Sequence, residues 1–234
     1  MQILSHRPDT QDEVVYRDVI QNNEYRLPPT LGPKDVVIDI GAHIGMFSVA
    51  CLLRGAGTVL AFEPDLQNFK FLEENLKPKE GQTAEAFLIA VWKPDADRML
   101  FTGYPDQYTA CGTILPDATV EKVNKRILVD TCGLDEILEH VAAQNRRVRL
   151  LKIDAEFAEY PILYGSKMLA LVDQVVMEVH EMPTMPKAAK VKGFNDYTVY
   201  GLAQHLKNHG FKVEIEWLRE YGTQSAFHLF AIRE

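Results

Sequence analysis

Residues 36–45, Val-Val-Ile-Asp-Ile-Gly-Ala-His-Ile-Gly, decide how this chain folds. Val36–Ile40 is a short apolar run rich in β-branched residues, which is typical of a strand buried on both faces. An apolar, helix-compatible segment follows at residues 44–54, so Gly41 and Gly45 fall in a tight strand-to-helix turn. Ligands of open α/β sheets bind beyond the carboxyl ends of the strands. We therefore expect this turn to line a ligand site.

The turn does not match the dinucleotide-binding pattern G-x-G-x-x-G. His43 occupies the position of the second glycine, and no third glycine follows at the right spacing. This disfavours a nicotinamide-dependent oxidoreductase, which stays an alternative enzyme class. Asp39 lies next to the end of the strand and is expected to place a carboxylate at the rim of the site, where it would suit an ammonium group or a hydroxyl.

Strand and helix signals alternate along most of the chain. This predicts an α/β fold with a Rossmann-like, doubly wound, mostly parallel sheet. Two final strands without an intervening helix predict an antiparallel hairpin at the C-terminal end. The expected strands are Val36–Ile40, Thr58–Phe62, 86–91, 99–102, 127–131, Val148–Ile153, 174–180, 212–217 and 226–232, and the expected helices are 44–54, 65–76, Leu134–Ala143, 159–171 and Val199–Asn208.

We expect one domain over residues 1–234, with residues 1–34 as an N-terminal extension. Residues 92–131 interrupt the alternation with a long polar loop between two strands. Long loops inside compact domains are often functional, so we interpret this segment as an insertion that covers the site, with a disordered surface excursion as the alternative. Tyr104, Tyr108 and Cys111 lie in it.

Glu63 follows the second strand, about 20 residues after the glycine turn. An acidic residue at this place commonly holds ribose hydroxyls in such folds. Alone, Glu63 would be read as a solvated acid before a turn formed by Pro64. Its register with the glycine turn favours ribose binding.

Charged residues also follow the strand Val148–Ile153. Asp154 ends this strand, where a charge would face the ligand crevice rather than the core. Glu156 lies two residues further and is expected to share a face with Asp154. The alternative for Glu156 and for Glu159 is that they are acids that stabilise a helix N-terminus.

Glu178 and His180 are two residues apart near the end of the next strand, so they share one side of it. A carboxylate and an imidazole at a crevice can act together as a general base, or they can act as metal ligands. We expect His180 to be the general base, because an unperturbed imidazole titrates near neutral pH, and Asp154 is the second candidate. A structural role for His180 stays open.

Together these motifs resemble the FkbM family of S-adenosylmethionine (SAM)-dependent methyltransferases. The resemblance covers about residues 36–181, and the order and spacing of its motifs are more specific than any one glycine turn. Its segments are residues 37–45, 61–64 with Asn75, 131–136 (Thr-Cys-Gly-Leu-Asp-Glu), 151–156 and 177–180. It implies the methyltransferase fold, SAM as cofactor, and an acceptor hydroxyl of a sugar, macrolide, modified peptide or other natural-product intermediate.

The resemblance also implies roles for individual residues. Asp39, Gly41 and Gly45 would line the amino acid end of SAM, Glu63 would hold its ribose, and Asp154 would lie near its methyl group. The other expected cofactor contacts are Ala42, His43, Pro64, Ala90 and Val91, of which the last two would lie near the adenine. Family members commonly have Asn where this chain has His43, and Gly where it has Phe157. The bulk of Phe157 would alter the acceptor geometry.

Composition limits the other possible functions. The 234 residues contain 25 Lys and Arg and 33 Asp and Glu, a formal net charge of −8, which disfavours a nucleic-acid surface. Three cysteines without metal-ligand spacing favour a reducing, cytoplasmic setting. The sequence shows no signal peptide pattern and no apolar stretch of membrane-spanning length. We therefore expect neither nucleic-acid nor membrane partners.

Three questions stay open from the sequence. A base-methylating enzyme is disfavoured because the chain has neither an Asn/Asp-Pro-Pro-aromatic segment nor a Pro-Cys nucleophile. A non-catalytic SAM-binding domain is disfavoured because it would need no acid or base in the crevice. We assign no metal ligands, although a requirement for Mg²⁺ would make the carboxylates and His180 candidates.

Overall fold

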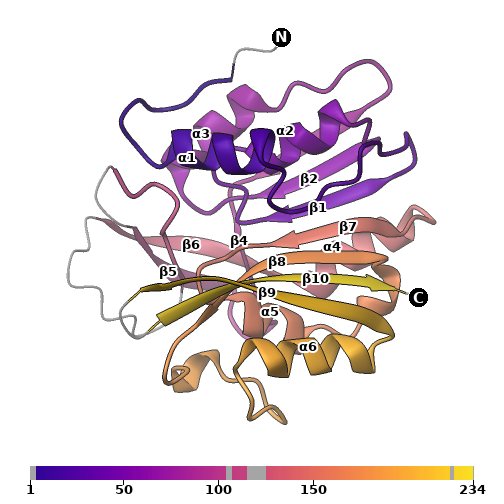
Figure 1. Cartoon of the computed structure of the whole chain (residues 1–234). Coiled ribbons are helices and arrows are strands. Elements are labelled where there is room, and N and C mark those ends of the chain that lie inside the picture. The colour runs from indigo at the N-terminus through magenta and orange to yellow at the C-terminus, as the bar shows by residue number, and fades with distance from the viewer. Residues whose placement is uncertain (1–3, 104–106, 115–124, 222–223, 234) are drawn as a thin grey trace.

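The computed structural model describes residues 4–103, 107–114, 125–221 and 224–233. Its centre is a seven-stranded sheet in the order β3-β2-β1-β7-β8-β10-β9 (Figure 1). Strands β3, β2, β1, β7 and β8 pair in parallel, whereas β10 is antiparallel to both β8 and β9. The strands are β1 (Val36–Ile40), β2 (Thr58–Phe62), β3 (Thr83–Phe87), β7 (Val148–Ile153), β8 (Gln174–Glu181), β9 (Phe211–Tyr221) and β10 (Gln224–Arg233). The predicted sheet and C-terminal hairpin are confirmed.

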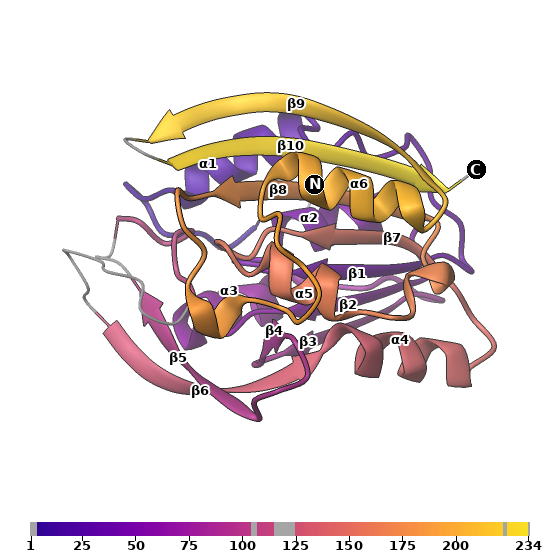
Figure 2. The same cartoon turned by 90° about the horizontal axis from the view of Figure 1, so that it is seen from below.

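Helices cover both faces of this sheet. α2 (Met46–Leu53) and α3 (Leu66–Asn75) lie on one side, and α4 (Leu134–Ala143), α5 (Glu159–Gly165) and α6 (Val199–Asn208) lie on the other (Figures 1 and 2). The alternation of β1 explains this arrangement. Val37 packs into the cluster that contains α2, whereas Ile38 packs into the cluster on the opposite face. Within the described residues, no helix combines the length and the hydropathy that crossing a bilayer requires.

The order of the strands reverses between β1 and β7. From β1 the chain builds β2 and β3 to one side, and it later returns to add β7 and β8 on the other. A crevice forms at the carboxyl ends of the strands at such a reversal. The glycine turn after β1 and the acidic segment after β7 therefore meet at this crevice.

The N-terminal residues pack against the α2 side of the sheet. They form α1 (Asp12–Tyr16) and a five-residue π-helix (Arg17–Gln21). Tyr25 is buried, and its ring meets the ring of Phe47 edge-on at 5.4 Å. The predicted extension is thus a layer over the crevice.

A second, three-stranded sheet stands beside the first. It has the order β4-β6-β5, formed by β4 (Ala90–Trp92), β5 (Arg98–Gly103) and β6 (Lys125–Gly133). The strand predicted at 86–91 is wrong in its bounds. β3 ends at Phe87, opposite the last residue of β2, and the chain then leaves the main sheet so that β4 pairs with β6.

Two helix ends also differ from the prediction. The helix expected from residue 44 begins at Met46, because Gly45 adopts a left-handed conformation with φ +88°. The helix expected over 159–171 ends at Gly165. The Asp135 carboxylate accepts hydrogen bonds from the Ser166 hydroxyl and the Lys167 backbone N–H, which holds the chain in a turn before a 3₁₀ helix (Leu169–Leu171).

Candidate active site

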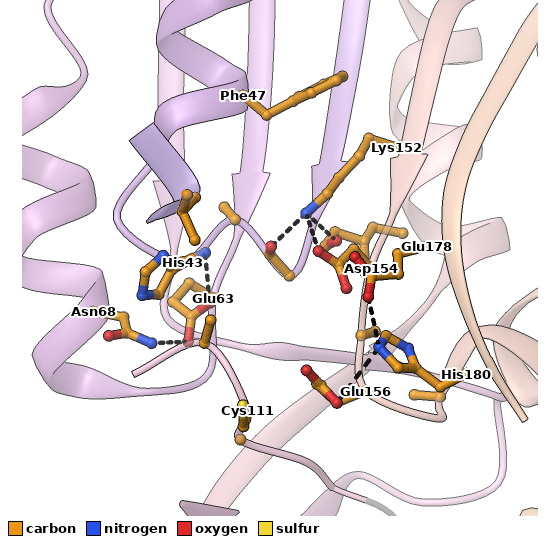
Figure 3. Close-up of a pocket in the computed structure, with 18 of the residues that line it drawn as sticks. His43, Phe47, Glu63, Asn68, Cys111, Lys152, Asp154, Glu156, Glu178 and His180 are labelled. Atoms are coloured by element: carbon orange, nitrogen blue, oxygen red, sulfur yellow. Dashed lines mark hydrogen bonds and ion pairs between the residues drawn. The ribbon is translucent and has the colours of Figure 1, made fainter. Parts of the chain in front are cut away.

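A cavity of about 710 Å³ occupies the crevice between β1 and β7. This volume is typical of small-molecule sites. Figure 3 shows side chains from several elements directed toward it. Its walls come from the β1–α2 turn, the ends of β2, β7 and β8, the N-terminal residues, residues 108–112 and the tip of the β9–β10 hairpin. Of the expected site residues it contains Gly41, Ala42, His43, Glu63, Pro64, Ala90, Val91, Asp154, Glu156, Glu178 and His180.

Gly41 is required by the close approach of two strand ends. Its φ is +72°, and a Cβ there would lie 1.8 Å from the backbone oxygen of Asp154. Any side chain would therefore push the turn away from β7. Gly45 serves packing instead, because a Cβ on it would meet Leu72 at 2.7 Å, and Gly45 does not line the cavity.

His43 lies in the turn with φ +53°. Asparagine tolerates this left-handed region better than most residues, which explains why Asn suits the position. The His43 side chain is buried, and its Nε2 contacts the Thr109 hydroxyl at 3.0 Å and the Asp12 carboxylate at 3.3 Å. His43 therefore ties the turn to segments that lie over the cavity.

Glu63 is buried at the end of β2 and faces the same turn. One carboxylate oxygen accepts the backbone N–H of His43 at 2.8 Å, and the other accepts that of Asp65 at 2.9 Å. Burial raises the pKa of Glu63 to about 7, although these two hydrogen bonds oppose the shift. Asn68 adds a third donor at 3.4 Å. Glu63 is thus fixed in position and titrates close to neutral pH.

Asp39 is fully buried and does not line the cavity, so the expected placement at the rim is wrong. Its side chain lies beneath the turn, where it accepts a hydrogen bond from Ser48 at 2.7 Å. The Lys152 ammonium lies 3.3 Å from it. The reason is register: Asp39 pairs with Lys152 across β1 and β7, so both side chains lie on the face covered by α2.

Lys152 links this buried acid to the cavity. Its ammonium donates to the Gly41 carbonyl oxygen at 2.6 Å and lies 3.6 Å from the Asp154 carboxylate. Desolvation lowers the pKa of Lys152, but Asp39 and Asp154 outweigh it, so the net shift is upward. Lys152 is therefore a fixed cation between the two strands and cannot be a base.

Asp154 receives a second partner from the N-terminal layer. The hydroxyl of buried Tyr25 donates to its carboxylate at 2.9 Å. Burial and the nearby carboxylates raise the pKa of Tyr25 well above 10, so the phenol stays a donor. Asp154 is thereby held in position by two contacts, one with the Lys152 ammonium and one with the Tyr25 hydroxyl.

His180 lies among three carboxylates, of which Glu156 and Glu178 are drawn in Figure 3. Its Nδ1 is 3.1 Å from Glu159, and its Nε2 is 3.3 Å from Glu178 and 3.7 Å from Glu156. Although burial opposes it, the three carboxylates raise the pKa of His180 well above 6.5. An imidazole that these carboxylates hold protonated has no free lone pair to accept a proton, so His180 does not fit the role of general base that the sequence predicted.

Glu159 is fully buried and builds the loop before α5. Its carboxylate accepts the backbone N–H groups of Ala155 and Phe157 at 3.0 and 3.2 Å, besides its contact with His180. The loop places Glu156 at φ +46° and Phe157 at φ +78°. Glycine adopts such conformations readily, so Phe157 departs from the family pattern at a position whose backbone favours glycine.

Part of the predicted insertion lies over the cavity: Phe101, residues 108–112 and Ile114 line it. Tyr108, Cys111 and Gly112 line the cavity, whereas Tyr104 lies outside the described residues. This segment contacts the N-terminal layer: the Gln11 backbone N–H donates to the Gln107 carbonyl at 3.2 Å.

Sequence reasoning missed four side chains of the site. Lys152 lies within the segment 151–156, and a charged residue inside a predicted buried strand could have indicated a role in the site. Asn68, Tyr25 and Arg219 carry no such signal, because only tertiary packing brings them to the cavity. Arg219, on β9, forms an ion pair with Glu178.

The fold and the site together define a class of protein. A doubly wound parallel sheet ending in an antiparallel hairpin, with a glycine turn after β1 and an acid after β2, is the arrangement of SAM-dependent methyltransferases. The chain belongs to the FkbM methyltransferase family, whose model, described as the methyltransferase FkbM domain, matches residues 39–222. SAM is accordingly its cofactor.

Individual proteins agree with this assignment. AMB antimetabolite synthetase AmbE of Pseudomonas aeruginosa is 30% identical over 258 residues, which cover 95% of this chain, and the chain spans 12% of that protein's length. The 31-O-demethyl-FK506 methyltransferase FkbM of Streptomyces tacrolimicus is 27% identical, with 91% of this chain and 86% of that protein covered. An rRNA methylase from Streptococcus thermophilus shares the fold, with a TM-score of 0.51 at 10% identity over 93% of this chain and 96% of that chain.

Proposed function

We propose that this chain methylates a hydroxyl group of a small-molecule or natural-product intermediate, such as a sugar, a macrolide or a modified peptide. The observation that carries the proposal is the cluster of Asp154, Glu156, Glu178 and His180 next to the glycine turn. A hydroxyl needs a base and a fixed orientation before it can attack a methyl group, and this cluster can provide both.

The donor half of the cavity supports the placement of SAM. Gly41 lines the cavity in the turn after β1, at the end of the sheet where ligands of such folds bind. Glu63 presents a buried carboxylate to the cavity at the end of β2, where ribose hydroxyls could donate to it. Ala90 and Val91 are buried apolar residues of the wall, and we assign them to the adenine.

When bound, SAM supplies an electrophilic methyl group: the acceptor oxygen bonds to the methyl carbon, the carbon–sulfur bond breaks, and the hydroxyl proton passes to a base. We assign Glu156 as that base, because it is the least restrained carboxylate of the cluster. Its carboxylate lies 3.7 Å from the His180 ring, whereas Asp154 is held by Tyr25 and Glu178 by Arg219. In this role His180 orients Glu156.

The acceptor class is supported by charge and by the relatives. The three carboxylates of the cluster and a net charge of −8 disfavour a polyanionic acceptor. Two of the relatives carry the names of an antimetabolite synthetase and of a methyltransferase of 31-O-demethyl-FK506. We propose for this chain an acceptor of the same class, a natural-product intermediate, and no particular compound.

The test is a comparison of metabolites from the producing organism with and without this gene. We expect at least one compound to be replaced by a form lighter by one CH₂ unit when the gene is deleted. A gene encoding Glu156→Gln is the matched control and should not restore the methylated compound. Feeding ¹³C-methyl methionine and recording carbon NMR then identifies the methylated atom, and a label on nitrogen or carbon would contradict the proposal.

A further inference from the structure

We propose that Asp154, Glu178 and His180 bind one divalent cation, of the Mg²⁺ and Mn²⁺ class, at the acceptor end of the cavity. The binding of the ion is inferred from these side chains alone, whereas its role rests on the function proposed above. The ion would hold oxygen atoms of the acceptor next to Glu156.

The three side chains converge from two neighbouring strands. Asp154 directly follows β7, and Glu178 and His180 lie two residues apart on β8, so they share one side of that strand. One ligand atom of each residue lies within 4.8 Å of the others. Opposite ligands of a six-coordinate Mg²⁺ are roughly 4 Å apart. Side-chain rotations that move the ligand atoms by about half an ångström or more would therefore bring all three into coordination.

The orientation of His180 is the independent observation that points to a ligand. Glu159 is fully buried and contacts Nδ1 at 3.1 Å. The Glu159 oxygen that faces Nδ1 already accepts two backbone N–H groups, so it is an acceptor and Nδ1 is the donor. Nε2, whose proton a metal ion would displace, is directed toward Glu178 and Glu156. A buried carboxylate behind one nitrogen, with the other nitrogen directed to a site, is the usual setting of a metal-bound histidine.

The charges around the cluster favour a cation. Four carboxylates lie around His180: Asp154, Glu156, Glu159 and Glu178. The cations that contact them, among the described residues, are Lys152, Arg219 and, while no metal is bound, the protonated ring of His180. Lys152 also neutralises the buried Asp39. The site therefore has more negative charge than its own side chains balance, and a divalent ion would correct this.

The ligand set favours Mn²⁺ over Mg²⁺. Two carboxylates suit either ion, but the imidazole nitrogen suits a transition metal better. The Irving–Williams order also places Mn²⁺ at the weak end of that series, so the site should release it readily. Three protein ligands leave about three coordination positions for water or acceptor oxygens.

Binding is tested with Mn²⁺ alone, on the whole chain without SAM or acceptor. We expect the electron paramagnetic resonance signal of free Mn²⁺ to fall as one ion binds per chain, and excess Mg²⁺ to restore it. His180→Asn and Glu178→Gln should each weaken Mn²⁺ binding at least tenfold. His140→Asn, at an exposed histidine on α4, is the matched control and should bind as the wild type does.

Glu159→Gln separates orientation from coordination. Because Glu159 is placed behind His180 rather than in the site, this substitution should weaken Mn²⁺ binding by about 10–100-fold without abolishing it. Circular dichroism shows whether each variant is folded like the wild type. If the His180→Asn variant does not fold, the Glu178→Gln variant provides the test of the site.

Two results would overturn the metal site: a wild-type chain that leaves the Mn²⁺ signal at its free value, or a folded His180→Asn variant that binds Mn²⁺ as tightly as the wild type. These measurements use no acceptor, so they test the metal site separately from the proposed function. A chain that binds Mn²⁺ but methylates no hydroxyl would support the site and contradict the function.

Discussion

Glu63 changes its charge state near neutral pH. Its pKa of about 7 is raised by burial, so its ionised fraction rises from about one tenth at pH 6 to about nine tenths at pH 8. The ribose hydroxyls donate much more strongly to the ionised carboxylate than to the neutral acid. Binding of SAM should therefore strengthen as the pH rises through 7.

We expect the affinity for SAM, measured by calorimetry, to fall about tenfold from pH 8 to pH 6. Glu63→Gln should weaken binding at pH 8 by about 1–3 kcal/mol and remove this pH dependence, because glutamine has no proton to lose. A Glu63→Gln variant with unchanged affinity would show that Glu63 does not hold the ribose.

Glu156 is the residue on which the chemical step should depend. Glu156→Gln removes the proposed base but keeps the size of the side chain, so we expect kcat to fall by about 10²–10⁴-fold while SAM affinity is retained. His180→Ala should also lower kcat, because it removes the group that orients Glu156. A Glu156→Gln enzyme with full kcat, together with an inactive Asp154→Asn enzyme, would assign the base to Asp154 instead.

The turn between β1 and α2 tolerates little change at Gly41. Gly41 and Gly81 have similar backbone conformations, with φ of +72° and +81°. A Cβ at Gly41 would lie 1.8 Å from the Asp154 backbone oxygen, whereas a Cβ at Gly81 would meet nothing within 4 Å. The pair therefore separates the cost of a left-handed backbone from the cost of a clash.

Gly81→Ala should lower the free energy of unfolding by about 1 kcal/mol, whereas Gly41→Ala should lower it by roughly 1–3 kcal/mol more and abolish SAM binding. Denaturant unfolding and calorimetry measure both effects. If both variants lose the same free energy of unfolding, the end of β7 can move away from the turn without cost. The close approach of β7 to the turn would then not be what fixes the site.

The same elements show how far a sequence predicts a structure. β1, β2, β7, α4 and α6 have their predicted bounds, because each is a strongly patterned run that ends at a turn or a cap. The two residues of β8 that face the cavity were found because alternation along a strand places them together. Asp39 was misplaced, because its neighbour across the sheet, Lys152, decides its surroundings and no local pattern contains that pairing. Tyr25 was missed for the same reason.

At the scale of the whole molecule, two segments distant in sequence lie over the cavity and contact each other. Thr109 donates to Asp12 at 2.7 Å, and the Ala110 backbone N–H donates to the Gln11 side chain at 3.1 Å. Both segments also contact the turn through His43. The cover should therefore respond to ligands as one unit.

We expect hydrogen exchange of residues 107–114 and of α1 to slow together when demethylated SAM and the acceptor bind, because a filled cavity stabilises the cover. Exchange in α4, on the other face of the sheet, is the control and should not change. Protection confined to one of the two segments would show that they move separately.

The β9–β10 hairpin also closes the cavity, through Arg219 and residues 224–226. It is attached to β8 at the side of the sheet remote from β1 and β2. Substitutions at this tip can accumulate without disturbing the glycine turn or Glu63. Lineages of such enzymes can therefore diversify the compounds that they accept while inheriting one donor pocket unchanged, and exchanging the hairpin between relatives is a route to new selectivity.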